Sequence, residues 1–233
     1  MIRRKIAGKK LVEGSIDALS ASSANTGYIG IPICLMVLGP EGLQPALISS
    51  LIVVCVMFAV ALTFVEIGLQ SEPNFFGALK SVAIRLAKNP LVITPMLGGL
   101  WATTGLGLAE PVIKLLDMLA AATTPCALIS LGLFLSRKQS STAKGAWPLV
   151  AVKLFVQPFV TCVFAFKVFV LPALWAHSAL LLSALPTGTG PFMIAEYYRR
   201  EAGVIAKVIL LTTLGSIITV SASIVWIKST TSA

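Results

Sequence analysis

Long apolar segments without charged residues limit what this chain can fold into more than any other feature. Six stretches of 19 to 28 residues contain no Asp, Glu, Lys or Arg, namely residues 18–40, 43–65, 89–109, 118–136, 168–195 and 208–227. A seventh stretch, residues 145–166, contains only Lys153. A bilayer core about 30 Å thick needs about 20 helical residues, whereas barrel strands would be shorter and would alternate polar with apolar residues. The sequence therefore predicts an all-α, polytopic membrane protein with seven transmembrane helices.

The distribution of basic residues predicts how the chain is oriented. Only 12% of the residues are charged, against about 25% in soluble domains, and the net charge is +9. Fourteen of the 18 Lys and Arg residues lie within residues 3–10, 80–88, 137–144 and 199–207, which are the N-terminal segment and alternate loops. The positive-inside rule then places the N-terminus in the cytoplasm and the C-terminus outside. Binding of the basic loops to nucleic acid or to anionic lipid is the more specific interpretation, but topology alone accounts for the positive charge, and no nucleic-acid partner is expected.

Residues that could hold a metal or catalyse a reaction are few. The four Cys residues lie singly on four different spans without a CxxC pair, which is typical of small buried apolar side chains. The single His, His177, lies beside Trp175 and is expected at the membrane interface. No catalytic residue, metal or cofactor is therefore expected. Lys153 lies one or two turns inside its span, and we expect its ammonium group to extend back to the cytoplasmic headgroups.

Two of the spans contain clusters of helix-breaking and polar residues. The clusters are Asn25-Thr26-Gly27-Tyr28-Ile29-Gly30-Ile31-Pro32 and Leu185-Pro186-Thr187-Gly188-Thr189-Gly190-Pro191-Phe192. Proline removes a backbone donor and glycine weakens a helix further. In hydrocarbon the freed backbone groups have no water, so such breaks persist only when they are packed inside protein or line a wet cavity. Ordinary proline kinks are the alternative explanation, but two polar clusters in otherwise apolar spans favour a site.

Both breaks are expected near the middle of the membrane. Pro32 lies 17 residues after Ser15, and Pro186 lies 13 residues after Ala173. In the predicted topology the first span runs outward and the sixth runs inward. Two broken helices of opposite direction that meet near the midplane indicate an inverted-repeat secondary transporter. The N-termini of the half-helices would present N–H groups and positive dipole ends that suit a carboxylate.

With these residues in view, the chain resembles the auxin efflux carrier family, which includes bacterial malonate-transporter-like proteins, and more distantly the bile acid/sodium symporters. The resemblance covers nearly the whole chain. It rests on the order and spacing of residues 25–32 with 39–42, 88–90 with 98–100, 125–128 with 131–132, and 185–192 with 195–198.

The resemblance implies ten helices in two inverted repeats of five, in which the fourth and ninth helices are broken and cross around the substrate site. The first and sixth spans of this chain match those two helices. Carried over by position, the substrate site contains Asn25, Thr26, Gly27, Gly30, Pro32, Pro186, Thr187, Gly188, Thr189, Gly190 and Pro191. Of these, Asn25, Thr187 and Thr189 are expected to lie nearest an anionic solute.

The chain departs from the resemblance at its N-terminus, where three helices of the first repeat are expected to be missing. Residues 1–15 are then a basic cytoplasmic segment, 16–70 the end of the first repeat, 71–86 a cytoplasmic loop, 87–228 a complete second repeat, and 229–233 an outer tail. A truncated gene, a mis-assigned start and one part of a split carrier stay open, and the chain could be inactive alone. A homodimer or a partner that supplies the missing helices would complete the assembly.

The predicted function is a secondary transporter that moves a small organic anion, such as a malonate-like or auxin-like carboxylate, by alternating access across a bacterial inner membrane. A seven-helix membrane receptor or sensor is the alternative that the number of spans suggests. A retinal protein would need a lysine deep in the last helix, and Lys207 and Lys228 lie at the two ends of that span. A receptor of the G-protein type would leave the paired breaks unexplained. An enzyme is not expected, and the substrate, the direction and the coupling ion stay open.

Overall fold

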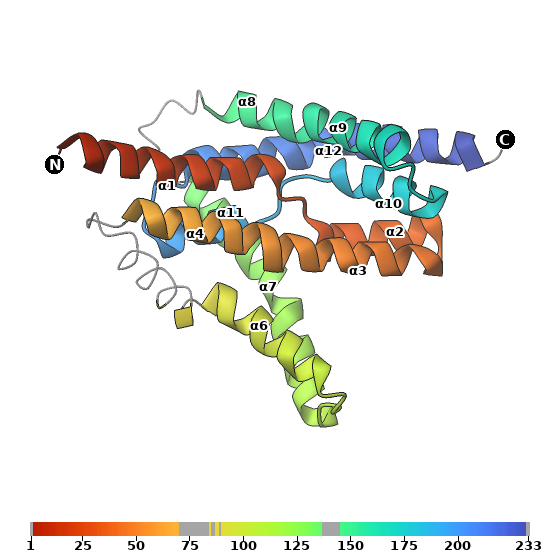
Figure 1. Cartoon of the computed structure of the whole chain (residues 1–233), viewed down its shortest axis with the longest axis horizontal. Coiled ribbons are helices and arrows are strands. Elements are labelled where there is room, and N and C mark those ends of the chain that lie inside the picture. Colours follow the sequence, from red (N-terminus) through yellow and green to blue (C-terminus); the bar gives the residue numbers. More distant parts are fainter. Residues whose placement is uncertain (1, 70–83, 85–86, 89, 137–144, 232–233) are drawn as a thin grey trace.

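The computed structural model describes residues 2–69, 84, 87–88, 90–136 and 145–231, and these are almost entirely helical. The only strand-type pairing within these ranges is an isolated antiparallel bridge between Ala24 and Thr187. The all-α prediction is therefore confirmed for this part of the chain. Most helices lie side by side in one elongated bundle, and the two termini lie at its opposite ends (Figure 1).

The first part of the bundle contains a broken helix followed by a continuous one. The broken helix comprises α1 (Ile2–Ser22), the π-helical turn η1 (Thr26–Gly30) and α2 (Ile31–Leu38). The continuous helix comprises the 3₁₀ turn η2 (Pro40–Gly42), α3 (Leu43–Leu51), the π-helical segment η3 (Ile52–Met57) and α4 (Phe58–Leu69). The helix before the first break thus begins far ahead of residue 16, inside the segment that was predicted to precede the membrane.

The second part of the bundle has a continuous helix, a broken helix and a long final helix. The first of these comprises α8 (Ala146–Ala151), η4 (Val152–Val156), α9 (Gln157–Val163) and η5 (Phe164–Val168). The broken helix comprises α10 (Ala173–Ser183) and α11 (Gly190–Tyr197), and the chain ends with α12 (Gly203–Thr231). In both parts a broken helix is followed directly by a long apolar helix.

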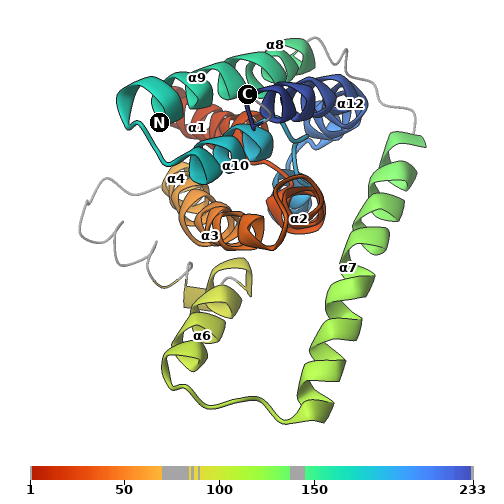
Figure 2. The same cartoon turned by 90° about the vertical axis from the view of Figure 1, so that its right-hand side faces the viewer.

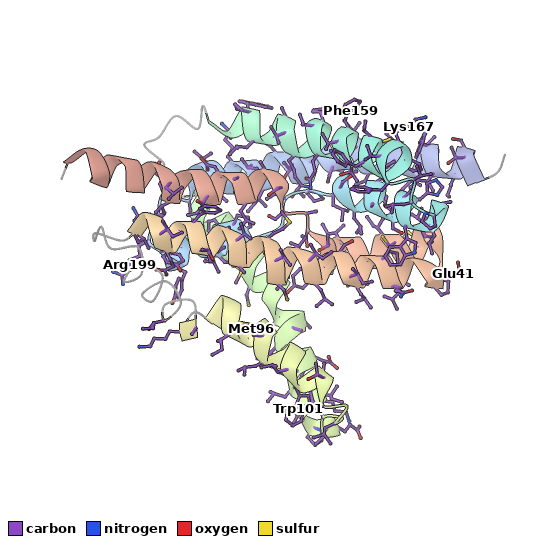
Figure 3. The ribbon with its side chains drawn as sticks, in the orientation of Figure 1. Glu41, Met96, Trp101, Phe159, Lys167 and Arg199 are labelled. Carbon is purple, nitrogen blue, oxygen red and sulfur yellow. The ribbon has the colours of Figure 1, made fainter. Side chains whose placement is uncertain are left out.

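A helical hairpin diverges from the bundle. It comprises α6 (Pro90–Thr103) and α7 (Glu110–Ser136), which splay apart and away from the other helices (Figure 1, Figure 2). At its bundle end, α6 contacts η3 and α7 contacts α12. Met96 and Trp101 of α6 are 61% and 46% exposed and point outward (Figure 3). Of the predicted loop at residues 71–86, only Ile84 lies within the described residues.

In the part of the chain that the structure describes, three helices are long and apolar enough to cross a membrane. They are Pro40–Leu69, Ala146–Val168 and Gly203–Thr230, with mean hydropathies of 2.7, 2.0 and 2.2. Thr26–Leu38 and Ala173–Ser183 are also apolar but shorter, because each is one half of a broken helix. The chain is thus built around membrane-length helices, and the number of seven crossings stays a prediction.

Two apolar cores lie on either side of the two breaks. The first contains side chains from α1, α4, α11 and α12, including Ile16, Leu62 and Ile205. The second contains side chains from α2, α3, α10 and α12, including Cys34, Ala46 and Leu181. The outer surface carries large apolar side chains as well, as in Phe159, which is 70% exposed and points away from the bundle (Figure 3). Such a surface suits hydrocarbon, because only water penalises exposed apolar area.

Candidate functional site

The two helix breaks meet and pair with each other. The chain leaves helical geometry after Ser22 of α1 and after Ser183 of α10. The two unwound segments then run antiparallel, and the Asn25 N–H donates to the Pro186 carbonyl at 2.9 Å. The Gly188 N–H donates in return to the Ser23 carbonyl at 3.3 Å. Each break therefore supplies hydrogen-bond partners for the other, which is what unwound backbone inside a membrane protein requires.

The prolines of the two clusters take different positions. Pro191 is the second residue of α11, where a proline costs no helical hydrogen bond, since the first N–H groups of a helix have no partner within it. Pro32 is the second residue of α2, but α2 continues directly from the π-helical turn η1, in which the Ile31 N–H donates to the Thr26 carbonyl. Pro186 lies in the unwound segment itself, where its carbonyl accepts the Asn25 N–H. Pro186 thus lies between the two half-helices α10 and α11, and Pro191 lies at the start of the second one.

The carbonyl ends of α1 and α10 are closed by donors from inside the protein. The Gln157 Nε2 atom donates to the Ser22 carbonyl at 2.8 Å, and the Lys153 Nζ atom donates to the Ser183 carbonyl at 3.2 Å. The hydroxyl of Thr219 donates to the Ala184 carbonyl at 2.9 Å. These carbonyls would otherwise be unpaired in the interior, because the last four of a helix lack intrahelical partners.

Thr187 connects the second break to two other helices. Its hydroxyl donates to the Ser20 carbonyl of α1 at 2.8 Å, and its N–H donates to the Thr212 hydroxyl of α12 at 3.1 Å. The residue is 1% exposed. Its polar atoms are therefore used in holding α1, α12 and the second break together.

The amide ends of η1 and α11 border a cavity of about 200 Å³. Its lining contains residues of both breaks together with apolar residues of η3, α4 and α11. The lining residues are Ser23, Ala24, Asn25, Thr26, Gly27, Tyr28, Val53, Val54, Phe58, Gly188, Thr189, Gly190, Pro191 and Met193. None of these side chains is charged, so the field inside the cavity comes from backbone and side-chain dipoles. The N-terminal ends of helices carry the positive end of the helix dipole, and such an arrangement attracts anions.

Ser23 presents an unsatisfied polar group at this cavity. Its side chain is 1% exposed, and its hydroxyl has no hydrogen-bond partner among the described residues. A buried hydroxyl without a partner is destabilising by about 1–3 kcal/mol. Such groups in a native fold call for an explanation, and a ligand or an ordered water in the cavity would provide one.

The structure divides the eleven predicted site residues into two groups. Seven of them line the cavity, namely Asn25, Thr26, Gly27, Gly188, Thr189, Gly190 and Pro191. The other four build the crossing: Pro32 begins α2, Pro186 and Thr187 make the hydrogen bonds described above, and Gly30 packs against α10. A Cβ atom at Gly30 would come within 2.6 Å of the Leu182 side chain, so a larger residue there would require that side chain to move.

The apolar wall of the cavity has no counterpart in the sequence-based prediction. Val53, Val54 and Phe58 belong to η3 and α4, which read as an ordinary apolar span. The Phe58 ring packs so closely on Gly190 that a Cβ atom there would overlap it. Only the tertiary fold reveals this wall, because uniform hydrophobicity does not distinguish a cavity wall from a lipid-facing side.

The prediction for Lys153 is wrong. The side chain is 0% exposed and donates to Gln157 Oε1 at 2.6 Å and to the Ser183 carbonyl, so it points into the crossing and not toward headgroups. A polar partner four residues away, Gln157, was the available signal, since side chains four apart share one helix face. A long cationic side chain with an amide partner can remain inside when helix ends supply further acceptors.

A larger groove of about 480 Å³ lies between α1 and the η3–α4 helix. Its lining is mostly apolar, including Leu11, Leu19 and Phe64. The hydroxyls of Ser15 and Ser22 in its wall donate to carbonyls of their own helix. This groove therefore offers few donors for a charged solute, although it is the larger of the two.

Comparison with known proteins gives concordant matches. Residues 2–225 match the family model described as "Membrane transport protein". The chain is 26% identical over 220 residues to the "Putative malonate transporter" of Rhizobium meliloti, covering 94% of this chain and 69% of that protein. It is 28% identical over 201 residues to an uncharacterised transporter of Methanocaldococcus jannaschii, covering 84% of this chain and 63% of that protein.

A plant protein is similar over a shorter region. The "Probable auxin efflux carrier component 5c" of Oryza sativa is 27% identical over 150 residues, covering 61% of this chain and 40% of that protein. The chain thus spans between two fifths and about two thirds of the length of these relatives.

Proposed function

Because the chain belongs to the membrane transport protein family of auxin efflux and malonate transporters, and is therefore a multi-pass membrane transporter and not an enzyme, we propose that it carries a small organic anion by alternating access. The observation that carries this proposal is the cavity at the crossing, which is lined by residues of two half-helix amide ends and by Ser23, whose buried hydroxyl has no partner among the described residues. A carboxylate fits such a site, since it accepts hydrogen bonds and is attracted by the positive dipole ends. Malonate-like and auxin-like carboxylates are the first candidates.

The two broken helices support an inverted-repeat arrangement. They run in opposite directions through the crossing, and each is followed by a long apolar helix. Residues 16–70 would form the end of a first repeat and residues 87–228 a second one, with seven crossings in all. In such carriers the substrate lies at the repeat interface near the midplane, and one part rocks against the other.

Orientation and assembly form part of the same proposal. We expect the N-terminus in the cytoplasm and the C-terminus outside, in the inner membrane of a bacterium, and the distribution of the basic segments supports this orientation. In Figure 3, Arg199 lies at one end of the bundle, while Glu41 and Lys167 lie at the other end, as two membrane sides would require. A second copy of the chain, or a partner with additional helices, would extend the scaffold around the site.

Uptake by the full chain in proteoliposomes tests the proposal. Labelled malonate and a series of mono- and dicarboxylates are supplied outside, and we expect saturable uptake that unlabelled anion reduces by competition. Asn25→Ala removes a polar side chain from the cavity and should raise KM, whereas Gln44→Ala removes an amide from an exposed position on α3 and should leave KM unchanged. Saturable uptake that both variants perform as well as the unchanged protein would contradict the site.

A further inference from the structure

Lys153 is a buried cationic side chain in the middle of an apolar helix. It lies in η4, between α8 and α9, and it is the largest fully buried side chain among the described residues. Charged groups inside membrane proteins are costly unless they are paired or hydrogen-bonded, and they often mark functional positions. The residue does not line the cavity, so its role has to be sought in what its amine contacts.

Lys153 is connected by hydrogen bonds to the carbonyl ends of both broken helices, directly in one case and through Gln157 in the other. The amine donates directly to the carbonyl of Ser183, the last residue of α10, at 3.2 Å. It also donates to Gln157 Oε1 at 2.6 Å. The Nε2 atom of the same amide donates at 2.8 Å to the carbonyl of Ser22, the last residue of α1. One continuous chain of hydrogen bonds thus joins the ends of the two half-helices.

The backbone around this pair explains how both side chains reach the crossing. Lys153 and Gln157 are four residues apart, so they share one face of the helix. Between them the helix takes a π-helical turn, and Pro158 follows as the second residue of α9. π-helical turns in otherwise regular helices are frequent at functional sites. Proline at the start of α9 removes one donor, and the wider turn before it accommodates the change.

The position of the amine also suits the electrostatics of the crossing. Carbonyl ends carry the negative end of the helix dipole, and a cation beside them is stabilising. Two such ends, from α1 and α10, are bridged here by the Lys153–Gln157 pair. The opposite ends, at η1 and α11, face the cavity. A donor group at the carbonyl ends therefore complements an anion at the amide ends.

We propose that Lys153, acting through Gln157, is the positioning residue of the carrier: it clamps the carbonyl ends of α1 and α10 together and so sets the spacing of the amide ends that bind the anion. The expected effect on transport rests on the proposed function. The clamp itself rests only on the hydrogen bonds of Lys153 and Gln157. Lys153 does not contact the transported anion. Loss of the Lys153 amine is expected to change the shape of the cavity, because the unwound segments that follow Ser22 and Ser183 form part of the cavity wall.

Three variants of the full chain test the clamp. Lys153→Met keeps the length of the side chain but removes its donor, while Lys153→Arg retains a cationic donor. The double exchange Lys153→Gln with Gln157→Lys retains one cation and one amide on the same helix face. Lys167→Met is the matched control, because Lys167 is an exposed lysine on the same continuous helix, near its far end (Figure 3).

The first readout is the KM of anion uptake in proteoliposomes. We expect Lys153→Met to raise KM by about tenfold, since breaking a buried polar pair leaves its partners unsatisfied. The Arg variant and the double exchange should stay within about threefold of the unchanged protein, because the carbonyl ends keep a charge-assisted donor. The Lys167→Met control should show no change. A folded Lys153→Met variant with unchanged KM would overturn the proposal.

The second readout is the thermal unfolding midpoint in detergent, which needs no transport activity. Lys153→Met should unfold at a lower temperature than the control, and the two variants that retain a cation should recover most of the difference. If the Met variant does not fold while the Arg variant and the double exchange do, the clamp is supported. If all three fail to fold, side-chain packing and not the donor is what matters, and the proposal is wrong. Absence of uptake by the unchanged chain would instead contradict the proposed function and leave this readout valid.

Discussion

The carbonyl ends and the amide ends of the half-helices meet in the same crossing, but the protein treats them differently. The carbonyl ends of α1 and α10 are closed by donors from other helices, chiefly Lys153, Gln157 and Thr219. The amide ends of η1 and α11 border a cavity. The difference teaches that a crossing of two broken helices has a structural side and a binding side. Substitutions on the first side should change stability, and should change the affinity for the anion only where they displace the amide ends, as at Lys153. Substitutions on the second side should change the affinity directly.

The largest effect is expected on the binding side at Gly190. A Cβ atom there would overlap the Phe58 ring, so Gly190→Ala must displace the amide end of α11 or the wall of the cavity. Overpacking of this kind typically costs about 1–3 kcal/mol. Where the anion-bound state bears that cost, the affinity falls by about fivefold to 150-fold, and uptake at low anion concentration falls with it. Initial rates of anion uptake in proteoliposomes measure the effect.

Gly27 provides the control for this substitution. It lines the same cavity, but a Cβ atom there would meet nothing within 4 Å. Gly27→Ala should therefore retain most of the uptake rate. Phe58→Leu introduced together with Gly190→Ala should recover part of the loss, because the smaller side chain relieves the overlap. Equal rates for the two alanine variants would contradict a binding side shaped by close packing.

A smaller effect separates the two sides within three residues of sequence. Thr187→Val removes the donor to the Ser20 carbonyl, and Thr189→Val removes a hydroxyl from the cavity wall. We expect the first variant to lose about 0.6–1.7 kcal/mol of stability, the range of interhelical hydrogen bonds in membrane proteins, with little change in KM. The second should keep its unfolding temperature and show a higher KM. Thermal unfolding in detergent and uptake kinetics measure the two quantities.

The reverse outcome for this threonine pair would undo the comparison. If Thr187→Val changed KM alone and Thr189→Val changed stability alone, the binding and structural sides would be exchanged. Because both substitutions replace a hydroxyl by a methyl group of similar size, packing changes are small and comparable in the two variants.

Much of the crossing could be predicted from the sequence, for a physical reason. Proline and glycine weaken a helix in an apolar span, and the cluster at residues 185–192 contains most of the second break. The cluster at residues 25–32 begins at Asn25, the last of the three residues of the first break, and the rest of it is helical. The need to satisfy the freed backbone groups inside a membrane then required the breaks to find partners. The pairing of Asn25 with Pro186 and of Gly188 with Ser23 meets that requirement. Seven of the predicted residues line the cavity as a result.

The rest depended on side-chain directions that the sequence does not reveal. Thr187 and Thr189 are equivalent by composition, yet the first is buried in hydrogen bonds and the second lines the cavity. Lys153 was predicted to extend toward headgroups because long cations usually do so near helix ends. Its buried position follows from the carbonyl of Ser183, which lies on a distant helix. Contacts between distant helices are fixed by the fold and not by local patterns.

The smallest expected effect concerns Ser23, and it tests whether the binding side is built for a ligand. Its buried hydroxyl has no partner within the described ranges, so Ser23→Ala removes no protein hydrogen bond and should leave the unfolding temperature unchanged or slightly raised. If the hydroxyl donates to the anion, KM should rise by about threefold to tenfold, the value of one hydrogen bond. Ser178→Ala is the matched control, because the Ser178 hydroxyl is equally buried and unpaired within those ranges but lies in α10, away from the cavity. A rise in KM for Ser23→Ala and none for Ser178→Ala would show that the Ser23 hydroxyl binds the anion. An unchanged KM in both variants would show that the Ser23 hydroxyl does not bind it and that the backbone N–H groups of the amide ends are the remaining donors.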